Sequence, residues 1–316
     1  MPSTAEILKT IGEPIVNEAF EELLSSRIPS TRAKMILNRF SKRWKDYSRP
    51  ALMVLACRAV GGDETLVHAA AKALILSGGA FDLHDDIIDK SYVRTRKKKK
   101  SIMGLYGADA TLLTGDALLI GGLMQLTKMC RTLPAETYKL VIQSIQDGLF
   151  ELGGAEMDEL RLVRNLNATP RAYLRIVKMK AADVESYLRI GSIIGNGTKE
   201  ENEALGRFGR LLGMVCILQD DVGDTFNDKL ELTSRICNES LPLPLLYALE
   251  DAKCRAKVKS IMNSPSNKEL DQLISLIDKN QGFERTKKII QRYSNEAKAE
   301  LKYIRNPGDL RLIFNI

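Results

Sequence analysis

The sequence predicts an all-α protein that folds as one large helical bundle over residues 1–316. Leu, Ala, Glu, Lys and Arg are frequent throughout, and all five are common in helices. No proline occurs between Pro50 and Pro134 or between Pro170 and Pro242, and no Gly/Ser-rich linker interrupts the chain. Apolar residues also recur at the spacing of amphipathic helices, so we expect helices from end to end.

The expected helices follow from this spacing in chain order. An amphipathic segment opens the chain, and two strongly apolar segments predict buried helices directly ahead of the acidic residues Asp85 and Asp220. The segments cover residues 5–24, 71–81, 133–160, 173–195, 207–218 and 270–304. A chain of 316 residues is long enough to bury a substantial core with these helices.

The net charge of +7 is concentrated in one segment. Arg94, Arg96 and the run Lys97–Lys100 carry six positive charges and leave about +1 for the rest of the chain. A nucleic-acid-binding protein usually spreads its basic residues over a face or carries groove-reading motifs, and neither is found in the sequence. We therefore expect no nucleic-acid partner. The run is typical of a solvated loop, and its position after an acidic motif also suits a polyanionic substrate.

Cysteine usage and the apolar stretches indicate a cytoplasmic location. The five cysteines are scattered without a Cys-x-x-Cys pair, which predicts buried thiols rather than disulfides or a zinc site. The N-terminus lacks the pattern of a secretory signal. The longest apolar stretch contains Asp116 and is too polar to span a membrane. The expectation is a soluble, cytoplasmic protein with no transmembrane segment.

The pattern Asp-Asp-x-x-Asp occurs twice, as Asp85, Asp86 and Asp89 and again as Asp220, Asp221 and Asp224. On a helix, the first and third aspartates of each copy would share a face, with the second offset by roughly 100°. Carboxylates this close repel one another unless a cation neutralises them, and Mg²⁺ prefers such oxygen ligands. A single copy is also compatible with a solvated acidic face. Two copies after buried helices favour a metal site.

Two such motifs facing one another across a central cavity would bind a diphosphate through Mg²⁺ and neutralise its charge as it leaves. Loss of diphosphate from an allylic substrate yields a carbocation, which survives only in a dry, apolar pocket. A helical bundle with acidic motifs at one end of its cavity provides both conditions.

The chain resembles the trans-isoprenyl diphosphate synthases, the family of farnesyl and geranylgeranyl diphosphate synthases. The resemblance extends from about Arg49 to Tyr247 and implies the all-α isoprenoid synthase fold as a single domain. The matching segments, in order, are "DDIIDKSYVR", "LLTGDALL", "VKMKAAD", "LQDDVGD" and "SLPLPLLYAL".

This resemblance implies a Mg²⁺-dependent condensation of an allylic diphosphate with isopentenyl diphosphate, using about three Mg²⁺ ions per active site. The family pattern also implies a homodimer, and a lipid product that brings the protein into contact with a membrane surface. Arg94 and Lys180 would bind the allylic diphosphate and Arg49 the isopentenyl diphosphate. The residues expected to be catalytic are Asp85, Asp86, Asp89, Lys180 and Asp220, and the expected metal ligands are Asp85, Asp89, Asp220, Asp221 and Asp224.

The chain departs from the family pattern mainly in the isopentenyl diphosphate half. Asp46 stands where the family motif has a lysine, and Asn238 where it has another. Gly78 replaces a histidine and Thr95 an arginine. Each lost charge-assisted contact is worth about 1.5 to 3 kcal/mol, and Asp46 would add repulsion. Whether nearby cations compensate or the acceptor has changed stays open.

Three alternatives to the synthase remain, of which a basic nucleic-acid or membrane-surface protein rests only on the loop with Lys97–Lys100. The weakened half-site favours a class I terpene cyclase or a prenyltransferase to another acceptor, and a non-catalytic partner subunit of a prenyl synthase is the third reading. Within the synthase reading, Phe81 lies one turn ahead of Asp85 and is expected to form the floor of the substrate cavity. The small residues around it would leave room for a product of about C15 to C25.

Overall fold

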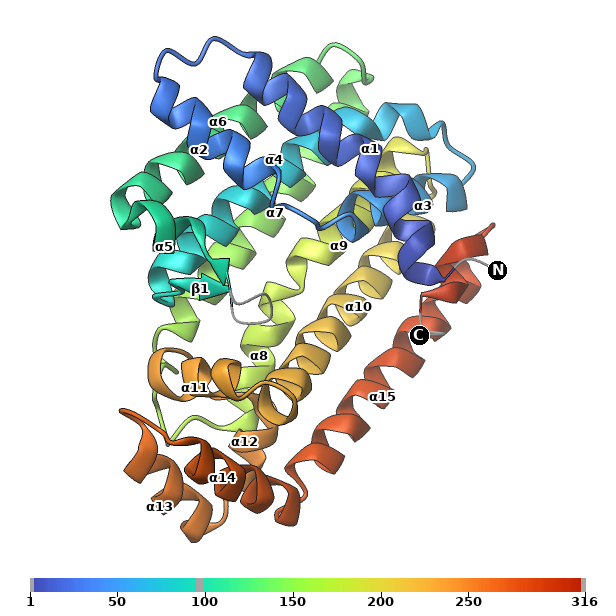
Figure 1. The fold of residues 1–316 in the computed structure, drawn as a ribbon. Helices are drawn as coiled ribbons and strands as arrows, with labels where there is room; N and C mark the ends of the chain where they lie inside the picture. Colours follow the sequence, from blue (N-terminus) through green and yellow to red (C-terminus); the bar gives the residue numbers. More distant parts are fainter. Residues whose placement is uncertain (1–2, 95–98, 314–316) are drawn as a thin grey trace. The chain divides into compact units, whose positions relative to one another are not determined.

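The computed structural model describes residues 3–94 and 99–313, and the regular secondary structure of this part consists of helices and one short two-stranded ribbon (Figure 1). The elements are α1 (Thr4–Ser25), α2 (Thr31–Ser41), α3 (Ser48–Ala59), the 3-10 helix η1 (Glu64–Val67), α4 (His68–Ile88), β1 (Val93–Arg94), β2 (Lys99–Lys100), α5 (Ile102–Tyr106), α6 (Ala108–Met129), α7 (Ala135–Glu159), α8 (Pro170–Lys180), α9 (Ala182–Ile194), α10 (Lys199–Phe226), α11 (Lys229–Asn238), α12 (Leu243–Ala248), α13 (Ala252–Ile261), α14 (Asn267–Lys279), α15 (Gly282–Glu300), and the 3-10 helices η3 (Leu301–Tyr303) and η4 (Gly308–Leu312). The predicted all-α fold is confirmed.

Several helices begin at residues that cap them. Ser3 and Ser266 each form a capping box, with Glu6 and Glu269 three residues later. Thr169 accepts a hydrogen bond from a first-turn amide of α8, directly ahead of Pro170. These caps satisfy amide groups that have no partner inside the helix, so they fix where α1, α8 and α14 begin.

Two of the expected helical segments are divided in the structure. The segment 173–195 breaks at Ala181, between α8 and α9. The segment 270–304 breaks between α14 and α15, where Gln281 adopts a φ of 59°. Apolar spacing continues across both breaks, so periodicity alone predicts longer helices than the chain forms. The antiparallel ribbon, in which Val93 pairs with Lys100, was not predicted either.

The chain divides into two compact units. The first contains residues 1–147, 184–208 and 300–316, and the second contains residues 148–183 and 209–299. The helices α7 and α10 contribute residues to both units. The expectation of a single domain over 1–316 stays a prediction.

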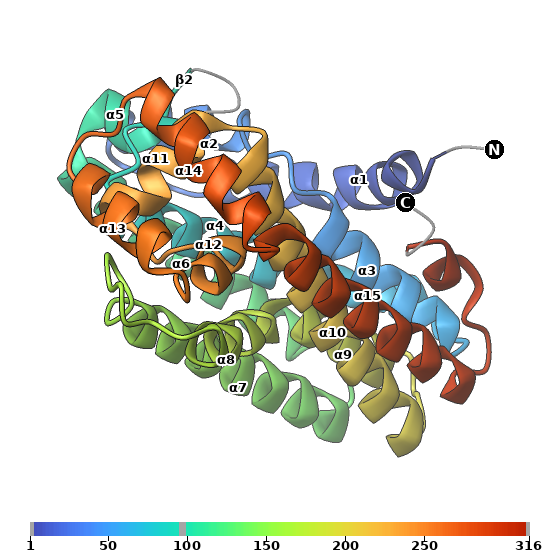
Figure 2. The same ribbon diagram turned by 90° about the horizontal axis from the view of Figure 1, so that it is seen from below.

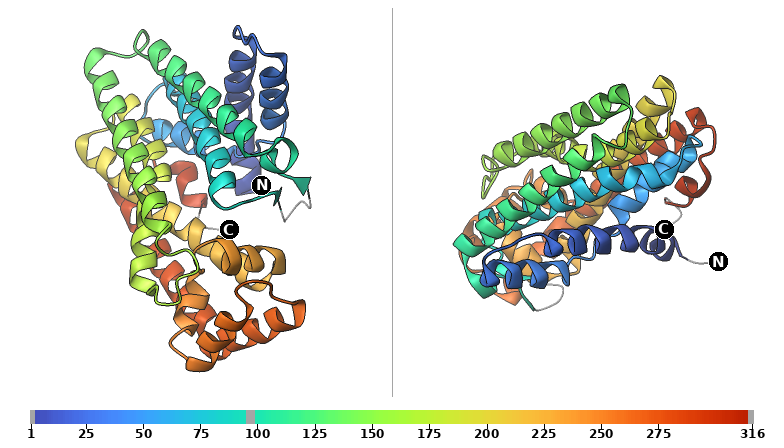
Figure 3. Two further views of the ribbon diagram at one scale, coloured as in Figure 1. Left: turned by 90° about the vertical axis from the view of Figure 1, so that its left-hand side faces the viewer. Right: turned by 90° about the horizontal axis from the view of Figure 1, so that it is seen from above.

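In the first unit, α4 packs against α6, and α1 packs against α2, α3 and α4 (Figures 1 and 3). The Lys72 side chain of α4 is almost fully buried, and its Nζ lies 2.8 Å from Glu18 Oε1 and 2.6 Å from Glu22 Oε1, both on α1. At Gly12 of α1, a Cβ atom would lie 1.9 Å from the carbonyl oxygen of Tyr47. Helix α1 is therefore in direct contact with the backbone that precedes α3.

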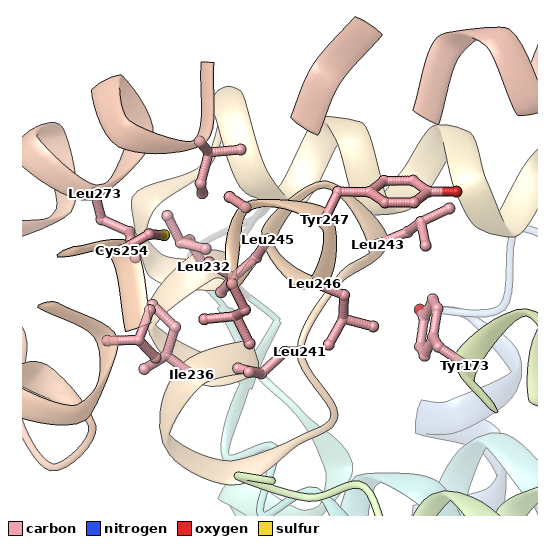
Figure 4. Packing of buried hydrophobic residues seen from close by; sticks show 14 of the residues in the cluster. Tyr173, Leu232, Ile236, Leu241, Leu243, Leu245, Leu246, Tyr247, Cys254 and Leu273 are labelled. Carbon is pink, nitrogen blue, oxygen red and sulfur yellow. The ribbon is translucent and has the colours of Figure 1, made fainter. Parts of the chain in front are cut away.

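In the second unit, α14 packs against α11, α12 and α13, and α12 packs against α8 (Figure 2). The apolar side chains of α11 and α12 meet in one buried cluster, which includes Leu232, Ile236, Leu243 and Leu246 (Figure 4). Tyr173 of α8 belongs to the same cluster. All six residues of α12 are buried, so the "LPLPLLYAL" segment supplies core of this unit.

Two segments of the described chain are long and apolar enough to span a membrane by length and composition, Glu64–Ile88 and Ala108–Met129. The second of them contains the apolar stretch around Asp116, and the expectation of no transmembrane segment stays a prediction. The most apolar windows of the two are 61% and 39% buried inside the protein. Core helices of soluble proteins meet the same criterion, so the finding is a weak indication of a membrane protein.

The cysteines differ in burial. Cys57 and Cys254 are buried, and burial raises the pKa of each thiol to about 11. Cys130 and Cys216 are exposed, so the expectation of buried thiols is wrong for these two. Cys216 lies on α10, within the segment 207–218 that apolar spacing predicted as a buried helix, and Cys130 is the C-cap of α6.

Candidate active-site residues

The first acidic motif lies at the C-terminal end of α4, in the first unit. Asp85 and Asp86 belong to the last turn, and Asp89 follows it as the C-cap, with its amide donating to the Asp85 carbonyl at 2.9 Å. Asp85 and Asp89 are therefore one turn apart, as the spacing predicts. Asp86 is buried at 5% exposure, whereas the outer two are half-buried.

His84 connects this motif to α6. Its Nε2 lies 3.5 Å from Asp116 Oδ1. A Cβ atom at Gly115 would lie 2.4 Å from the same Nε2, so a larger residue there would force the imidazole to move. Gly115 and Asp116 form the Gly-Asp pair of the family resemblance. Gly115 leaves space for His84, the residue next to the acidic motif, and Asp116 contacts it.

The turn after the first motif is held by Ser101. The Ser101 Oγ donates to the Ser91 carbonyl, and the Ser101 amide donates to the Tyr92 carbonyl at 3.0 Å. The backbone of Arg94 follows in β1, but its side chain lies outside the described part of the structure. Thr95, Arg96, Lys97 and Lys98 lie outside the described residues as well, so their predicted roles stay predictions. Lys99 and Lys100 are exposed in β2.

Arg49, the residue expected at the isopentenyl diphosphate, lies in the first turn of α3. Its Nη1 donates a short hydrogen bond to Asp46 Oδ2, so the two side chains form an ion pair. Asp46 Oδ1 also accepts from the Ser48 amide at 3.0 Å. The carboxylate that replaces a lysine of the family pattern is thus bound to the arginine that the pattern retains.

The second acidic motif lies near the end of α10, in the second unit. Asp220 is exposed and Asp224 is half-buried, whereas Asp221 is buried at 2% exposure. Asp221 Oδ1 accepts from Tyr173 Oη and from Arg235 Nη2, both at 2.8 Å. Its Oδ2 accepts from the Leu243 amide at 3.0 Å. This one carboxylate therefore joins α10 to α8, α11 and the start of α12.

These contacts favour a structural role for Asp221. Burial raises the pKa of Asp221 to about 6, and the Arg235 guanidinium beside it opposes that rise. The pKa of Arg235 is raised well above its usual range, because Tyr173, Asp221 and Glu239 outweigh the effect of its burial. Both oxygens of Asp221 are occupied by protein donors, so its assignment as a metal ligand stays a prediction that the geometry does not favour.

Lys180 ends α8, and it pairs with two glutamates of α7. Its Nζ lies 3.1 Å from Glu156 Oε1 and also contacts Glu159 Oε2. Burial raises the pKa of Glu156. For Glu159 burial acts in the same direction, but Lys180 and Arg235 outweigh it and lower the pKa. A diphosphate that binds Lys180 therefore has to compete with two carboxylates of the second unit.

The remaining predicted residues lie on α4 and α11. Phe81 is half-buried one turn before Asp85, and its role as a cavity floor stays a prediction. A Cβ atom at Gly78 would meet nothing within 4 Å, so the site has space for a side chain such as the histidine of the family pattern. Asn238 is the last residue of α11, and Arg235, one turn earlier, is committed to Asp221.

The donors of the two motifs suit a hard divalent cation, because all are carboxylate oxygens. Asp85 and Asp89 in the first unit, and Asp220 in the second, are the candidates to hold Mg²⁺. Within residues 3–94 and 99–313, no three His, Cys, Asp or Glu side chains converge closely enough to hold an ion by themselves. The outer aspartates of the two copies nevertheless offer carboxylates in half-buried or exposed positions, where an ion can reach them.

Sequence reasoning missed Tyr173, Arg235, Glu156 and Glu159. The acidic pair lies in "GGAEMDEL", and its spacing of three places both side chains on one face of α7, which is a signal that the sequence contains. Tyr173 and Arg235 carry no such signal. They lie 48 and 14 positions from Asp221, and only the fold brings them to it.

Comparison with known proteins identifies the family of the chain. The sequence profile of the polyprenyl synthetase family matches residues 34–277. A short chain isoprenyl diphosphate synthase from Methanothermobacter thermautotrophicus is 25% identical over 278 residues, which are 88% of this chain and 81% of that protein. An octaprenyl diphosphate synthase from Escherichia coli is 30% identical over 207 residues, which are 64% of this chain and 61% of that protein.

Solved structures share the fold. A geranylgeranyl pyrophosphate synthetase from Pyrococcus horikoshii has a TM-score of 0.87 at 22% identity, covering 98% of this chain and 97% of that one. A polyprenyl synthase from Caulobacter crescentus, in complex with calcium and isoprenyl diphosphate, has a TM-score of 0.82 at 20% identity, covering 98% and 94%. The fold, the two acidic motifs and the profile match agree, and the chain belongs to the polyprenyl synthetase family.

Proposed function

We propose that the protein is an isoprenyl diphosphate synthase, a prenyltransferase that condenses an allylic diphosphate with isopentenyl diphosphate. The observation that carries this proposal is the retention of both acidic motifs, each near the end of a long helix, in a chain of the polyprenyl synthetase family. Relatives are named as isoprenyl, geranylgeranyl and octaprenyl diphosphate synthases.

In this proposal Asp85 and Asp89 of the first motif and Asp220 of the second are the main metal ligands, and Asp86 and Asp224 are further carboxylates of the same two motifs. Mg²⁺, when bound, would neutralise the diphosphate and make it a better leaving group. We propose about three ions per active site. Helix geometry fixes Asp85 and Asp89 one turn apart, which supports the preorganisation of this pair.

Lys180 and Arg94 are proposed to bind the allylic diphosphate. In the structure Lys180 is held by Glu156 and Glu159, so its ammonium group is positioned before substrate binds. Proton removal after condensation needs no general base from the chain, because the departing diphosphate can accept the proton. Phe81 is proposed to limit the product to about C15 to C25.

We also propose a cytoplasmic homodimer, with α6 at its interface. The side of α6 that carries Leu113, Ile120 and Leu123 is apolar, and these three residues are 67%, 59% and 61% exposed. They follow one another at intervals of seven and three residues and thus form a stripe along one helix face. An exposed apolar stripe of this kind marks an interaction surface. A membrane surface, which the protein would contact while it releases a lipid product, is the other partner that we expect for this apolar stripe.

A second candidate function, prenyl transfer to another acceptor or cyclisation of the allylic substrate, is favoured by one observation. Arg49, the expected acceptor-binding residue, is already paired with Asp46. A nucleophile without a diphosphate would not need that arginine.

An assay with purified protein tests both candidates. Dimethylallyl, geranyl, farnesyl and geranylgeranyl diphosphates are each supplied with Mg²⁺, with and without isopentenyl diphosphate, and products are read by mass spectrometry. Longer prenyl diphosphates support the synthase and give its chain length. Diphosphate release with a hydrocarbon or alcohol product, and without elongation, supports the second candidate. Omitting Mg²⁺ and adding a chelator tests the metal requirement in the same assay.

A further inference from the structure

The loop between α2 and α3 places a carboxylate at an anion-binding position. Both oxygens of Asp46 accept hydrogen bonds, Oδ1 from the Ser48 amide at 3.0 Å and Oδ2 from the Arg49 guanidinium. Ser48 and Arg49 belong to the first turn of α3, which is 12 residues long. The Asp46 side chain is 24% exposed and that of Arg49 is 44% exposed, so water and ligands reach the pair.

The donors that hold Asp46 are those that proteins use for phosphate. Amides of a first helical turn carry partial positive charge, and a guanidinium binds carboxylate or phosphate oxygens with the same geometry. A phosphate of the substrate and the Asp46 carboxylate would therefore use the same Arg49 group. The phosphate and the carboxylate cannot both bind the Arg49 guanidinium fully, because two negative charges so close together repel each other.

The loop around Arg49 is otherwise cationic, so the Asp46 carboxylate is the group of this loop that opposes an incoming anion. Residues 42–49 contain four cationic side chains and one carboxylate, that of Asp46. Arg43 Nη1 donates to the Lys100 carbonyl at 2.7 Å, and Lys45 Nζ lies 3.3 Å from Tyr47 Oη. Both contacts are with uncharged oxygens, so they leave the charges of Arg43 and Lys45 in place. The acid of the loop is bound to Arg49.

We propose that Asp46 is a built-in competitor that lowers the affinity of Arg49 for the diphosphate of the acceptor. Asp46 is thereby a specificity-determining residue of the acceptor half of the site. The inference rests on the proposed function for the role of Arg49 at that diphosphate, but the competition itself needs only an anion. It predicts an acceptor site that binds a free diphosphate group weakly and is easily strengthened by removal of one charge.

The test measures binding and kinetics of Asp46→Asn. Isothermal titration of inorganic diphosphate and of isopentenyl diphosphate, without allylic substrate, gives the affinity directly. We expect about tenfold tighter binding than in the wild type, equivalent to about 1.4 kcal/mol. The KM for isopentenyl diphosphate should fall by a similar factor, while the KM for the allylic substrate stays unchanged.

Asp63→Asn is the matched control. Asp63 Oδ1 accepts from the Thr65 amide at 2.9 Å at the start of η1, in the same i to i+2 arrangement as Asp46 and Ser48. This variant removes the same charge and weakens the same kind of bond between a side chain and the amide two residues later, in the same unit. Its affinity for diphosphate should equal that of the wild type. Asp46→Ser is a second variant, which keeps a side-chain oxygen for the Ser48 amide without the charge, in case the asparagine destabilises the loop.

A double-mutant cycle with Arg49→Ala assigns the effect to the pair. In the Arg49→Ala background, replacement of Asp46 should change diphosphate affinity by less than about twofold. Unchanged or weaker binding in both Asp46→Asn and Asp46→Ser would overturn the inference, and so would a gain that persists without Arg49. Failure of the proposed function looks different. In that case the wild type forms no elongated product, while inorganic diphosphate still binds more tightly to the Asp46 variants.

Discussion

Arg235 Nη2 and Asp221 Oδ1 lie 2.8 Å apart in a buried ion pair, directly beside the exposed Asp220. The Asp221 side chain is 3% exposed and that of Arg235 is 14% exposed. Two consecutive carboxylates of one acidic motif therefore meet different environments. Asp221 holds helices of the second unit together, and Asp220 reaches the protein surface.

Replacing these neighbours should have opposite effects on stability. Asp221→Ala leaves the Arg235 guanidinium buried without its main counter-ion and should lower the free energy of unfolding by about 3 to 5 kcal/mol. Asp220→Ala should leave it level or raise it slightly, because a repulsion between carboxylates is removed. Urea denaturation measures both. Equal stability of the two variants would contradict the structural role of Asp221.

The same pair can be tested by replacing both partners with apolar residues. Asp221→Leu with Arg235→Met should be less destabilising than the sum of the two single changes, since neither charge is left buried alone. Urea denaturation of the four proteins gives the coupling free energy. Additive effects would mean that the two side chains stabilise the unit independently.

The outer aspartates should matter for turnover. Asp85→Ala and Asp220→Ala are each expected to lower kcat by at least about 100-fold, because each removes a ligand for the metal that neutralises the leaving group. Steady-state assays against Mg²⁺ concentration should also show a raised metal requirement. Asp109→Ala, in the first turn of α6, is the control and should retain wild-type kcat. Full activity of both motif variants would exclude their proposed role.

Acid should weaken the α1 to α4 contact through Glu22. Burial acts to raise the Glu22 pKa, but hydrogen bonds from Lys128, Lys72 and Gln125 outweigh it and lower it to about 2. A carboxyl with a lowered pKa stabilises the fold above its unfolded value of 4.5, and that stabilisation is lost as pH falls from 4.5 towards 2. With partial solvent screening, the contribution is on the order of 1 to 3 kcal/mol.

Glu22→Gln should therefore be less stable than the wild type at pH 7 and approach it near pH 2, as measured by urea denaturation across this range. The exposed neighbour Glu21 provides the control, since Glu21→Gln removes the same charge from the same helix and should retain the wild-type stability at pH 7. If Glu22→Gln lost stability in parallel with the wild type on acidification, the Glu22 carboxylate would not be the group responsible.

The apolar stripe of α6 should control assembly. Leu113→Lys combined with Leu123→Lys is expected to convert a dimer to a monomer in light scattering after size-exclusion chromatography, because two charges would be buried at the interface. Leu230→Lys, at a residue that is 54% exposed on α11, should leave the mass unchanged. A wild type that is monomeric at all concentrations, or that binds lipid vesicles through Leu113 and Leu123, would reject the dimer.

The sequence predicted what depends on local spacing. The helical class, the one-turn separation of Asp85 and Asp89, and the family all follow from short patterns that the structure and the comparisons confirm. The sequence did not show that Asp221 differs from Asp220. That difference arises from Tyr173 and Arg235, which only tertiary packing brings to the motif.

The helix breaks were missed for a similar reason. Apolar residues on both sides of Ala181 pack into the interior, so the periodicity continues where the backbone turns. Asp46 shows the opposite case. The sequence indicated that an acid there would oppose a diphosphate, and the contact with Arg49 identifies the group for which it competes.

The packing of helix α1 limits how far the chain can be shortened from its N-terminal side. The family profile begins at residue 34, after the end of α1 at Ser25. A fragment trimmed to the profile would keep every acidic motif but lose Gly12, against which the Tyr47 carbonyl rests, and both glutamates that neutralise the buried Lys72. The segment that the family profile matches is therefore smaller than the segment whose helices pack together. Expression boundaries should follow the packing of α1 and not the limits of sequence similarity.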